Sequence, residues 1–137
     1  MAPAPTRIVI SDRAATVCEH CVIADRARRR MKGLLGRSRL RGGEGLLLRP
    51  APSIHTWFMR FPIDAVFLDR DLVVLEVVEN MGPWRMASRR GARAVLELAA
   101  GEAARVGLEP GHRLSLLAPG SLPVPVVFVP TSVEGGA

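Results

Sequence analysis

Short apolar runs separated by Gly, Pro and Asp recur along most of the chain. Runs of this length that are rich in Val, Ile and Leu and bounded by turn residues are typical of β-strands. They predict strands at residues 7–10, 16–23, 45–48, 54–59, 63–68, 72–78, 94–98, 113–117 and 124–129. So many short strands favour an antiparallel sandwich or barrel over an alternating βαβ fold.

Two segments change to helical spacing. Apolar residues recur every three or four positions between Ala24 and Leu35, which predicts a helix over residues 25–35 with Asp25 as its N-cap. A second, shorter helix is predicted over residues 101–106. We therefore predict a mainly β fold with minor α content, an antiparallel β-barrel or sandwich with one packed helix and a second short helix.

The length of 137 residues predicts a single domain over residues 1–137 with a core of its own. Pro and Ala dominate the start of the chain and Gly its end, so we expect a loose N-terminus over residues 1–6 and a loose C-terminal tail over 119–137. The chain has neither an apolar run of the ~18 residues that cross a membrane nor the apolar core of a signal peptide. We expect a soluble, cytoplasmic protein without a membrane partner.

The net charge of the chain comes from one segment. Lys and Arg number 19 against 13 Asp and Glu, a formal charge of +6. Eight of the basic residues and no acid lie within residues 26–41, which leaves 11 basic groups against 13 acidic ones elsewhere. A basic stripe can bind nucleic acid electrostatically. Aromatic residues make up only 4% of the chain, however, which argues against a stacking platform for single strands.

Two carboxylates interrupt apolar strands. Asp64 shares its strand face with Val66 and Leu68, and Glu97 shares its face with Val95 and Ala99. A shielded carboxylate needs a cation or several hydrogen-bond donors. Arg37 and Arg60 are the nearest cations in the sequence, so the plainer interpretation is a structural salt bridge. The functional interpretation is a polar cleft built from Arg37, His55, Trp57, Met59, Arg60, Asp64 and Glu97.

Two further motifs carry candidate chemistry. Cys18 and Cys21 form a Cys-x-x-Cys pair inside a predicted strand, where their side chains are expected on opposite faces. Neither a second pair nor the helix start of a redox dithiol accompanies them, so we expect two reduced thiols and no metal or cofactor. Pro83-Trp84-Arg85 provides either a surface aromatic with a solvated cation or part of an anion-accepting pocket.

Several motifs follow one another along the chain in a fixed order: RMKGLLGR at 30–37, GLLL at 45–48, His55-Thr56, MRFPID at 59–64, PWR at 83–85, LEL at 96–98, Gly101, Gly107-Leu108 and Gly111. This ordered set resembles the domain-of-unknown-function 192 family. The resemblance covers a core of about residues 16–117. It implies a compact, mainly antiparallel β-barrel or sandwich with a packed helix, and it implies no established activity. The usual Gly-Asp of the family is Gly111-His112 here, and the cysteine pair lies outside the pattern.

The leading functional hypothesis is a non-enzymatic binding or accessory domain. The cleft would take a small polar or anionic ligand or a peptide, and we expect a monomer with no catalytic residues, metal or cofactor. One alternative is a hydrolase-like enzyme that uses His55 with Asp64 or Glu97 as acid and base. Another is electrostatic nucleic-acid binding through residues 26–41, which the confinement of the charge to one segment disfavours.

Overall fold

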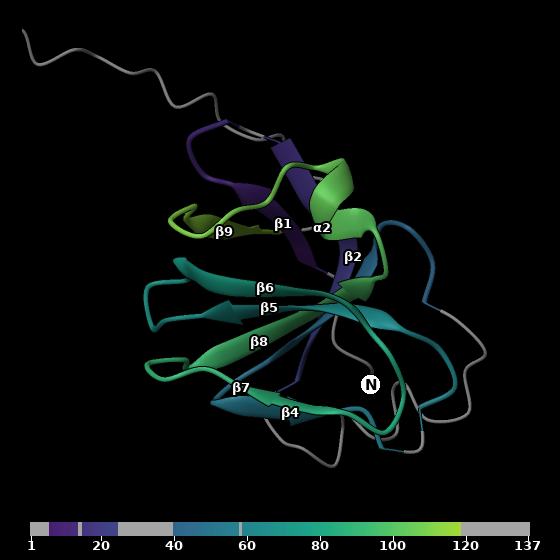
Figure 1. Ribbon diagram of the computed structural model, residues 1–137. Coiled ribbons are helices and arrows are strands. Elements are labelled where there is room, and N and C mark those ends of the chain that lie inside the picture. The colour runs from purple at the N-terminus through teal and green to yellow at the C-terminus, as the bar shows by residue number, and fades with distance from the viewer. Residues whose placement is uncertain (1–5, 14, 25–39, 58, 119–137) are drawn as a thin grey trace, which may run out of the picture.

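A seven-stranded sheet forms the body of the protein and curls into a half-barrel (Figure 1). The computed structural model describes residues 6–13, 15–24, 40–57 and 59–118. The strands of the large sheet are β1 (Thr6–Ile10), β2 (Ala15–Ala24), β3 (Glu44–Leu48), β5 (Ile63–Leu68), β6 (Val74–Met81), β8 (Ala94–Ala99) and β9 (Leu114–Leu117). Their order across the sheet is β6-β5-β8-β3-β2-β1-β9.

The pairing within the large sheet is antiparallel except between β2 and β3, which run parallel. A separate two-stranded ribbon pairs β4 (Ser53–His55) with β7 (Met86–Ser88). The described helix is α2 (Glu102–Arg105), and among the described residues no helix is long and apolar enough to cross a membrane. The mainly β fold with a short helix is confirmed. The helix predicted over 25–35 and the strand predicted over 124–129 lie outside the described residues.

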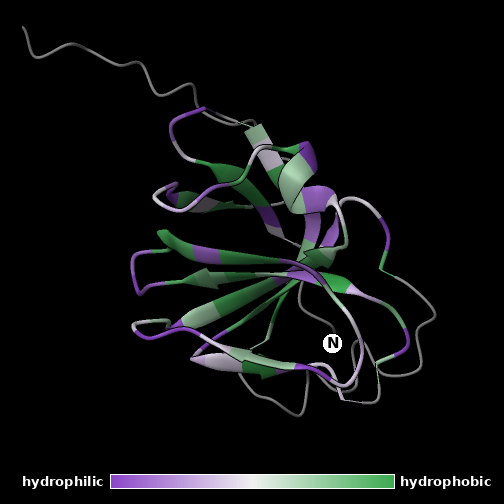
Figure 2. Ribbon diagram, viewed as in Figure 1, coloured by the Kyte–Doolittle hydropathy of each residue, from purple (hydrophilic) through white to green (hydrophobic). Residues whose placement is uncertain are grey.

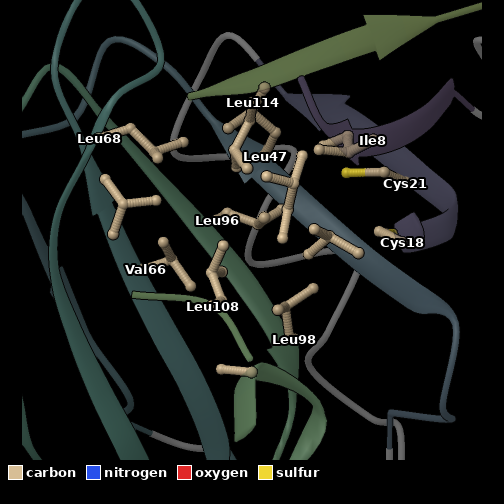
Figure 3. Close-up of a cluster of buried hydrophobic side chains, with 14 of the residues drawn as sticks. Ile8, Cys18, Cys21, Leu47, Val66, Leu68, Leu96, Leu98, Leu108 and Leu114 are labelled. Atoms are coloured by element: carbon tan, nitrogen blue, oxygen red, sulfur yellow. The ribbon is translucent and has the colours of Figure 1, made fainter. Parts of the chain in front are cut away.

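Hydrophobic residues predominate in the strands of the large sheet, and hydrophilic residues gather in the turns (Figure 2). Apolar side chains form one cluster on each face of this sheet. The first cluster lies on the face that carries Val66, Leu96 and Leu98 (Figure 3). The second cluster lies on the opposite face, around Ala65 and Val95, and the β4–β7 ribbon covers it through Ile54. Because both faces are covered, the central strands β5 and β8 read as continuous apolar runs.

The strand predicted over 54–59 is shorter than expected, and β7 was not expected at all. β4 ends at His55, because the main chain of Thr56 bonds to Arg85 and Trp84 of the turn that precedes β7. Val, Ile and Leu are absent from β7, so the apolar pattern gave no sign of a strand.

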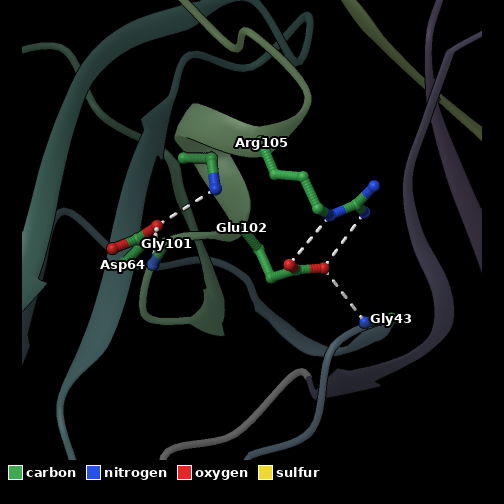
Figure 4. Close-up of polar contacts among 6 residues, drawn as sticks. Gly43, Asp64, Gly101, Glu102 and Arg105 are labelled. Atoms are coloured by element: carbon green, nitrogen blue, oxygen red, sulfur yellow. Dashed lines mark hydrogen bonds and ion pairs between the residues drawn. The ribbon is translucent and has the colours of Figure 1, made fainter.

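Helix α2 is tied to the loop that enters β3. Glu102 Oε1 accepts a hydrogen bond from the Gly43 N–H at 3.2 Å, and Arg105 Nε donates to Glu102 Oε2 at 2.9 Å (Figure 4). The guanidinium of Arg105 holds the pKa of the Glu102 carboxyl below its usual value, through the hydrogen bond and then the charge. Glu102 therefore joins the helix to the loop as an anion.

Glu102→Gln should lower thermal stability at neutral pH by a few degrees, and the difference from the wild type should vanish in acid. A folded-state pKa below the unfolded value of about 4.3 contributes stability above that pH, which is lost as the pH falls through the folded-state pKa. Thermal unfolding between pH 7 and pH 3 checks this. Arg105→Gln removes the same ion pair and should show the same profile, whereas a deficit that persists undiminished at pH 3 contradicts the prediction.

Candidate functional site

The outer face of the β4–β7 ribbon carries exposed aromatic and thioether groups. Ile54 pairs with Ala87 and points to the second cluster, so the next pair, His55 and Met86, lies on the outer side. The His55 ring lies 4.7 Å from the Trp57 ring, centroid to centroid. Trp57, Trp84 and Met86 are 43%, 62% and 65% exposed, which makes them the three most exposed large apolar side chains among the described residues. We call His55, Trp57, Trp84 and Met86 the ribbon face.

The segment that follows β4 alternates between core and solvent. Met59 and Phe61 are buried in the second cluster, whereas Trp57 and Arg60 point outward. The Met59 N–H donates to the Thr56 carbonyl at 3.2 Å, which closes a turn around Trp57. The buried residues therefore anchor the loop that presents the exposed ones.

The fully buried side chain of Thr56 fixes a second turn, the one that precedes β7. Its hydroxyl donates to the Gly82 carbonyl at 2.6 Å and accepts from the Arg85 N–H at 2.9 Å. The Trp84 N–H donates to the Thr56 carbonyl at 3.0 Å, and Trp84 has a φ of 62°, which a bulky side chain rarely adopts. Thr56 was not among the predicted cleft residues, although its hydroxyl inside an apolar run beside His55 was a signal in the sequence.

A groove of about 450 Å³ runs beside the ribbon face, between the end of β6 and β7. Its lining includes Val78, Glu79 and Met81 on one side and Arg85, Met86 and Ala87 on the other. The groove thus offers an apolar floor with one acidic and one basic side chain. Met86 belongs to both the groove and the ribbon face.

Asp64 is fully buried, as expected, but its described partners are main-chain amides (Figure 4). Its Oδ1 accepts from the Asn80 N–H at 2.8 Å, and its Oδ2 accepts from the N–H groups of Gly101 and Ala103, each at 3.0 Å. The carboxylate therefore caps the start of α2, where Gly101 has no side chain to do so. Because three main-chain N–H groups donate to this carboxylate, we assign Asp64 a structural role.

The register of the sheet separates the two buried carboxylates. Asp64 pairs with Leu98 and Glu97 pairs with Ala65, so Asp64 lies on the face of the first cluster and Glu97 on that of the second. His55 belongs to the ribbon, which covers the second cluster. The structure therefore brings together His55 and Trp57, whereas Met59, in the second cluster, and Glu97 share only the same side of the large sheet with them. It does not bring Asp64 to this group.

The remaining members of the expected cleft are distributed differently. Arg60 is exposed in the loop after Trp57. Arg37 lies outside the described residues, as does most of the basic segment 26–41, of which the structure describes Leu40 and the exposed Arg41.

Cys18 and Cys21 do not point to opposite faces, contrary to our expectation. The pairs Thr6–Cys21 and Ile8–Cys18 leave one extra residue in β2, and this bulge turns both side chains into the first cluster (Figure 3). Both thiols are free and fully buried, and contact with Cys18 together with burial raises the pKa of Cys21. No group of three potential metal ligands occurs among the described residues.

β2 and β3 approach closely at Gly45. A Cβ atom at this position would lie 2.8 Å from Cys18 Sγ, nearer than Cβ atoms approach other atoms in real proteins, and 3.0 Å from the Glu97 carbonyl oxygen, which is also tight. Glycine fits this space, whereas any side chain would force its neighbours to shift.

Thr56→Val should lower the free energy of unfolding by about 1–3 kcal/mol, because it leaves the Arg85 N–H and the Gly82 carbonyl without the buried hydroxyl. Urea unfolding followed by tryptophan emission measures the change at the site itself, since Trp57 and Trp84 are the two tryptophans of the chain. Thr56→Ser keeps the hydroxyl and serves as the matched control. Equal losses in both variants would show that the hydroxyl does not hold the turn.

Asp64→Asn should lower the free energy of unfolding by about 3 kcal/mol. The amide nitrogen of asparagine cannot accept the hydrogen bonds that one carboxylate oxygen accepts in the wild type. Asp69→Asn is the matched control, since Asp69 accepts from Asp71 and Val73 through Oδ1 alone and an asparagine keeps both bonds. Chemical denaturation of the two variants compares them directly. A loss in Asp64→Asn no larger than in Asp69→Asn is the contrary result.

The comparisons with known proteins agree on the fold. The chain is 25% identical to a Sinorhizobium meliloti 1021 protein described as "a putative transcription regulator", with a TM-score of 0.73 over 85% of this chain and 96% of that one. A protein of unknown function from Novosphingobium aromaticivorans DSM 12444 gives 24% identity and a TM-score of 0.69, over 81% of this chain and 83% of that one. The comparison with curated proteins gives no match. The DUF192 family model, described as "Uncharacterized ACR", matches residues 8–116, and the chain therefore belongs to the DUF192 family, as its motifs indicated.

Proposed function

We propose that this protein is a non-enzymatic binding domain whose ribbon face takes a small anionic ligand or a peptide carrying an apolar group. The observation that carries the proposal is the exposure of Met86 on the ribbon and of Trp57 and Trp84 in the two segments that adjoin the same end of it. Exposed aromatic and methionine side chains that lie together are typical of binding surfaces. Indole rings bury a large area on contact at a low cost in conformational entropy.

The fixed turn supports binding at this face. Thr56 holds Gly82 and Arg85 through its hydroxyl and Trp84 through its carbonyl, so Trp84 is positioned before any partner arrives. A surface that is already ordered loses less entropy on association. The strained φ of Trp84 is retained in an exposed turn, where no core packing of the side chain requires it.

The charge around the ribbon face favours an anion. Arg60 follows Trp57 in the loop after β4, and Arg85 follows Trp84, and both arginines are exposed. A guanidinium gives a carboxylate or phosphate two parallel hydrogen bonds, which adds direction to the apolar contact. We therefore propose an anionic ligand or acidic peptide, rather than nucleic acid or a membrane, as the partner of the monomer.

Acid–base catalysis by His55 with Asp64 is the weaker alternative. The two residues belong to opposite sides of the large sheet, and both Asp64 oxygens accept main-chain hydrogen bonds. A general acid–base pair has to meet at one substrate within hydrogen-bond reach. Glu97 lies on the side that the ribbon covers, but it is fully buried.

The two tryptophans provide the test, because a nitrogen-15 spectrum contains two indole N–H signals, from Trp57 and Trp84. We expect acetyl-Glu-Phe-Glu-amide to shift both signals in a saturable way. Acetyl-Lys-Phe-Lys-amide and acetyl-Glu-Ser-Glu-amide should bind about tenfold more weakly, since each lacks one of the two contacts. Arg85→Gln should remove the preference for the acidic peptide while leaving the fold intact.

Three outcomes overturn this proposal. Indole signals that respond to none of the peptides would remove the ribbon face as a binding surface. Equal binding of the acidic and basic peptides would remove the role of the arginines. A duplex DNA that binds at low salt through these signals more tightly than the acidic peptide would make nucleic acid the partner.

A further inference from the structure

Two strand edges border the groove beside the ribbon face. β6 is the outermost strand of the large sheet, and β7 has β4 as its neighbour in the ribbon. The groove lies between residues 78–81 of β6 and residues 85–87, at the start of β7. Residues from an outer strand of each sheet therefore line the same space of about 450 Å³.

The hydrogen bonds of the ribbon determine which main-chain groups of β7 face the groove. The Thr56 N–H donates to the Arg85 carbonyl at 2.8 Å, and the Arg89 N–H donates to the Pro52 carbonyl at 3.4 Å. Residues 85 and 89 thus turn their main chain toward β4. Main-chain groups alternate between the two edges of a strand, so the N–H and C=O groups of Met86 and Ser88 point away from β4. Met86 lines the groove, and Ser88 lies two residues further along β7.

The side chains around the groove suit an extended peptide that carries an acid. Val78, Met81 and Ala87 supply apolar contacts to the strand side chains that point inward. Arg85 lies at the β7 wall, where it can pair with a carboxylate, and Glu79 on the β6 wall disfavours an acid there. Arg85 and Glu79 therefore favour a peptide with a carboxylate and fix where along the groove that carboxylate lies.

We propose that an extended peptide adds to β7 as the third strand of the ribbon, lying in the groove with a carboxylate at Arg85. This inference rests on the proposed binding function and names its partner as a β-strand segment with alternating apolar side chains. Main-chain hydrogen bonds to Met86 and Ser88 supply affinity, and the groove selects the side chains. The added strand also covers the edge of β7 that pairs with no other strand in the described part of the chain.

Peptides test the main-chain contacts directly. The probe is acetyl-Val-Thr-Val-Glu-Val-amide, titrated into the nitrogen-15-labelled protein. We expect the amide signals of Met86 and Ser88 to shift and to become protected from hydrogen exchange. Two N-methylated versions of the probe each block one edge of the peptide, and at least one should bind about tenfold or more weakly, because it loses main-chain hydrogen bonds.

Protein variants test the same contacts from the other side. Met86→Ala keeps the main-chain N–H and loses the side chain, whereas Met86→Pro loses both. Proline is tolerated at an edge whose N–H does not pair within the sheet, so Met86→Pro should keep the β4–β7 ribbon. We expect the Met86→Pro variant to bind about tenfold more weakly than Met86→Ala. Ser53→Pro is the matched control, since residue 53 faces the opposite edge, on β4, and should bind like the wild type.

The outcomes distinguish this inference from the proposed function. If the indole signals respond but both N-methylated peptides bind as well as the parent, and Met86→Pro matches Met86→Ala, the ribbon face binds without strand addition and the inference is wrong. If neither the indole signals nor the amides of Met86 and Ser88 respond to any peptide, the proposed function fails as well. An equal loss in Ser53→Pro would place the added strand on β4 and also overturns the inference.

Discussion

The relative positions of β5, the end of β6 and α2 depend on the three hydrogen bonds that converge on Asp64. This one carboxylate joins β5 to the bulged end of β6 through Asn80 and to the start of α2 through Gly101 and Ala103. Loss of a donor to a buried charge costs stability, so the carboxylate couples the positions of the three segments. The end of β6 then leads into the turn that carries Trp84, which links the buried carboxylate to the exposed ribbon face.

The same sheet shows how far the alternation of apolar residues predicts structure. Period-two alternation correctly indicated that Asp64 is buried, because it depends on neighbours within one strand. It left open how β5 and β8 align, and that register places Asp64 and Glu97 on opposite faces. The hydrogen-bond partners of Asp64 could not be predicted from the sequence for a different reason. Every residue except proline carries an amide N–H, so no residue type signals a main-chain donor.

Local irregularities explain the other differences from the sequence. The extra residue in β2 reverses the direction of one cysteine, and nothing in Cys18-Glu19-His20-Cys21 distinguishes a bulged strand from a regular one. β7 forms because Thr56 and its neighbours hold the turn before it, not because its residues favour strands. The aromatic residues of the candidate site were visible in the sequence, whereas Thr56, which fixes their turn, acts through contacts far apart along the chain.

The close approach of β2 and β3 restricts two positions at once. Cys18 Sγ and the Glu97 carbonyl oxygen occupy the space in which a Cβ atom of residue 45 would lie. Substitutions at positions 45 and 18 should therefore be coupled in free energy. An alanine at 45 should be tolerated best together with a smaller residue at 18 and a small shift of the Glu97 carbonyl.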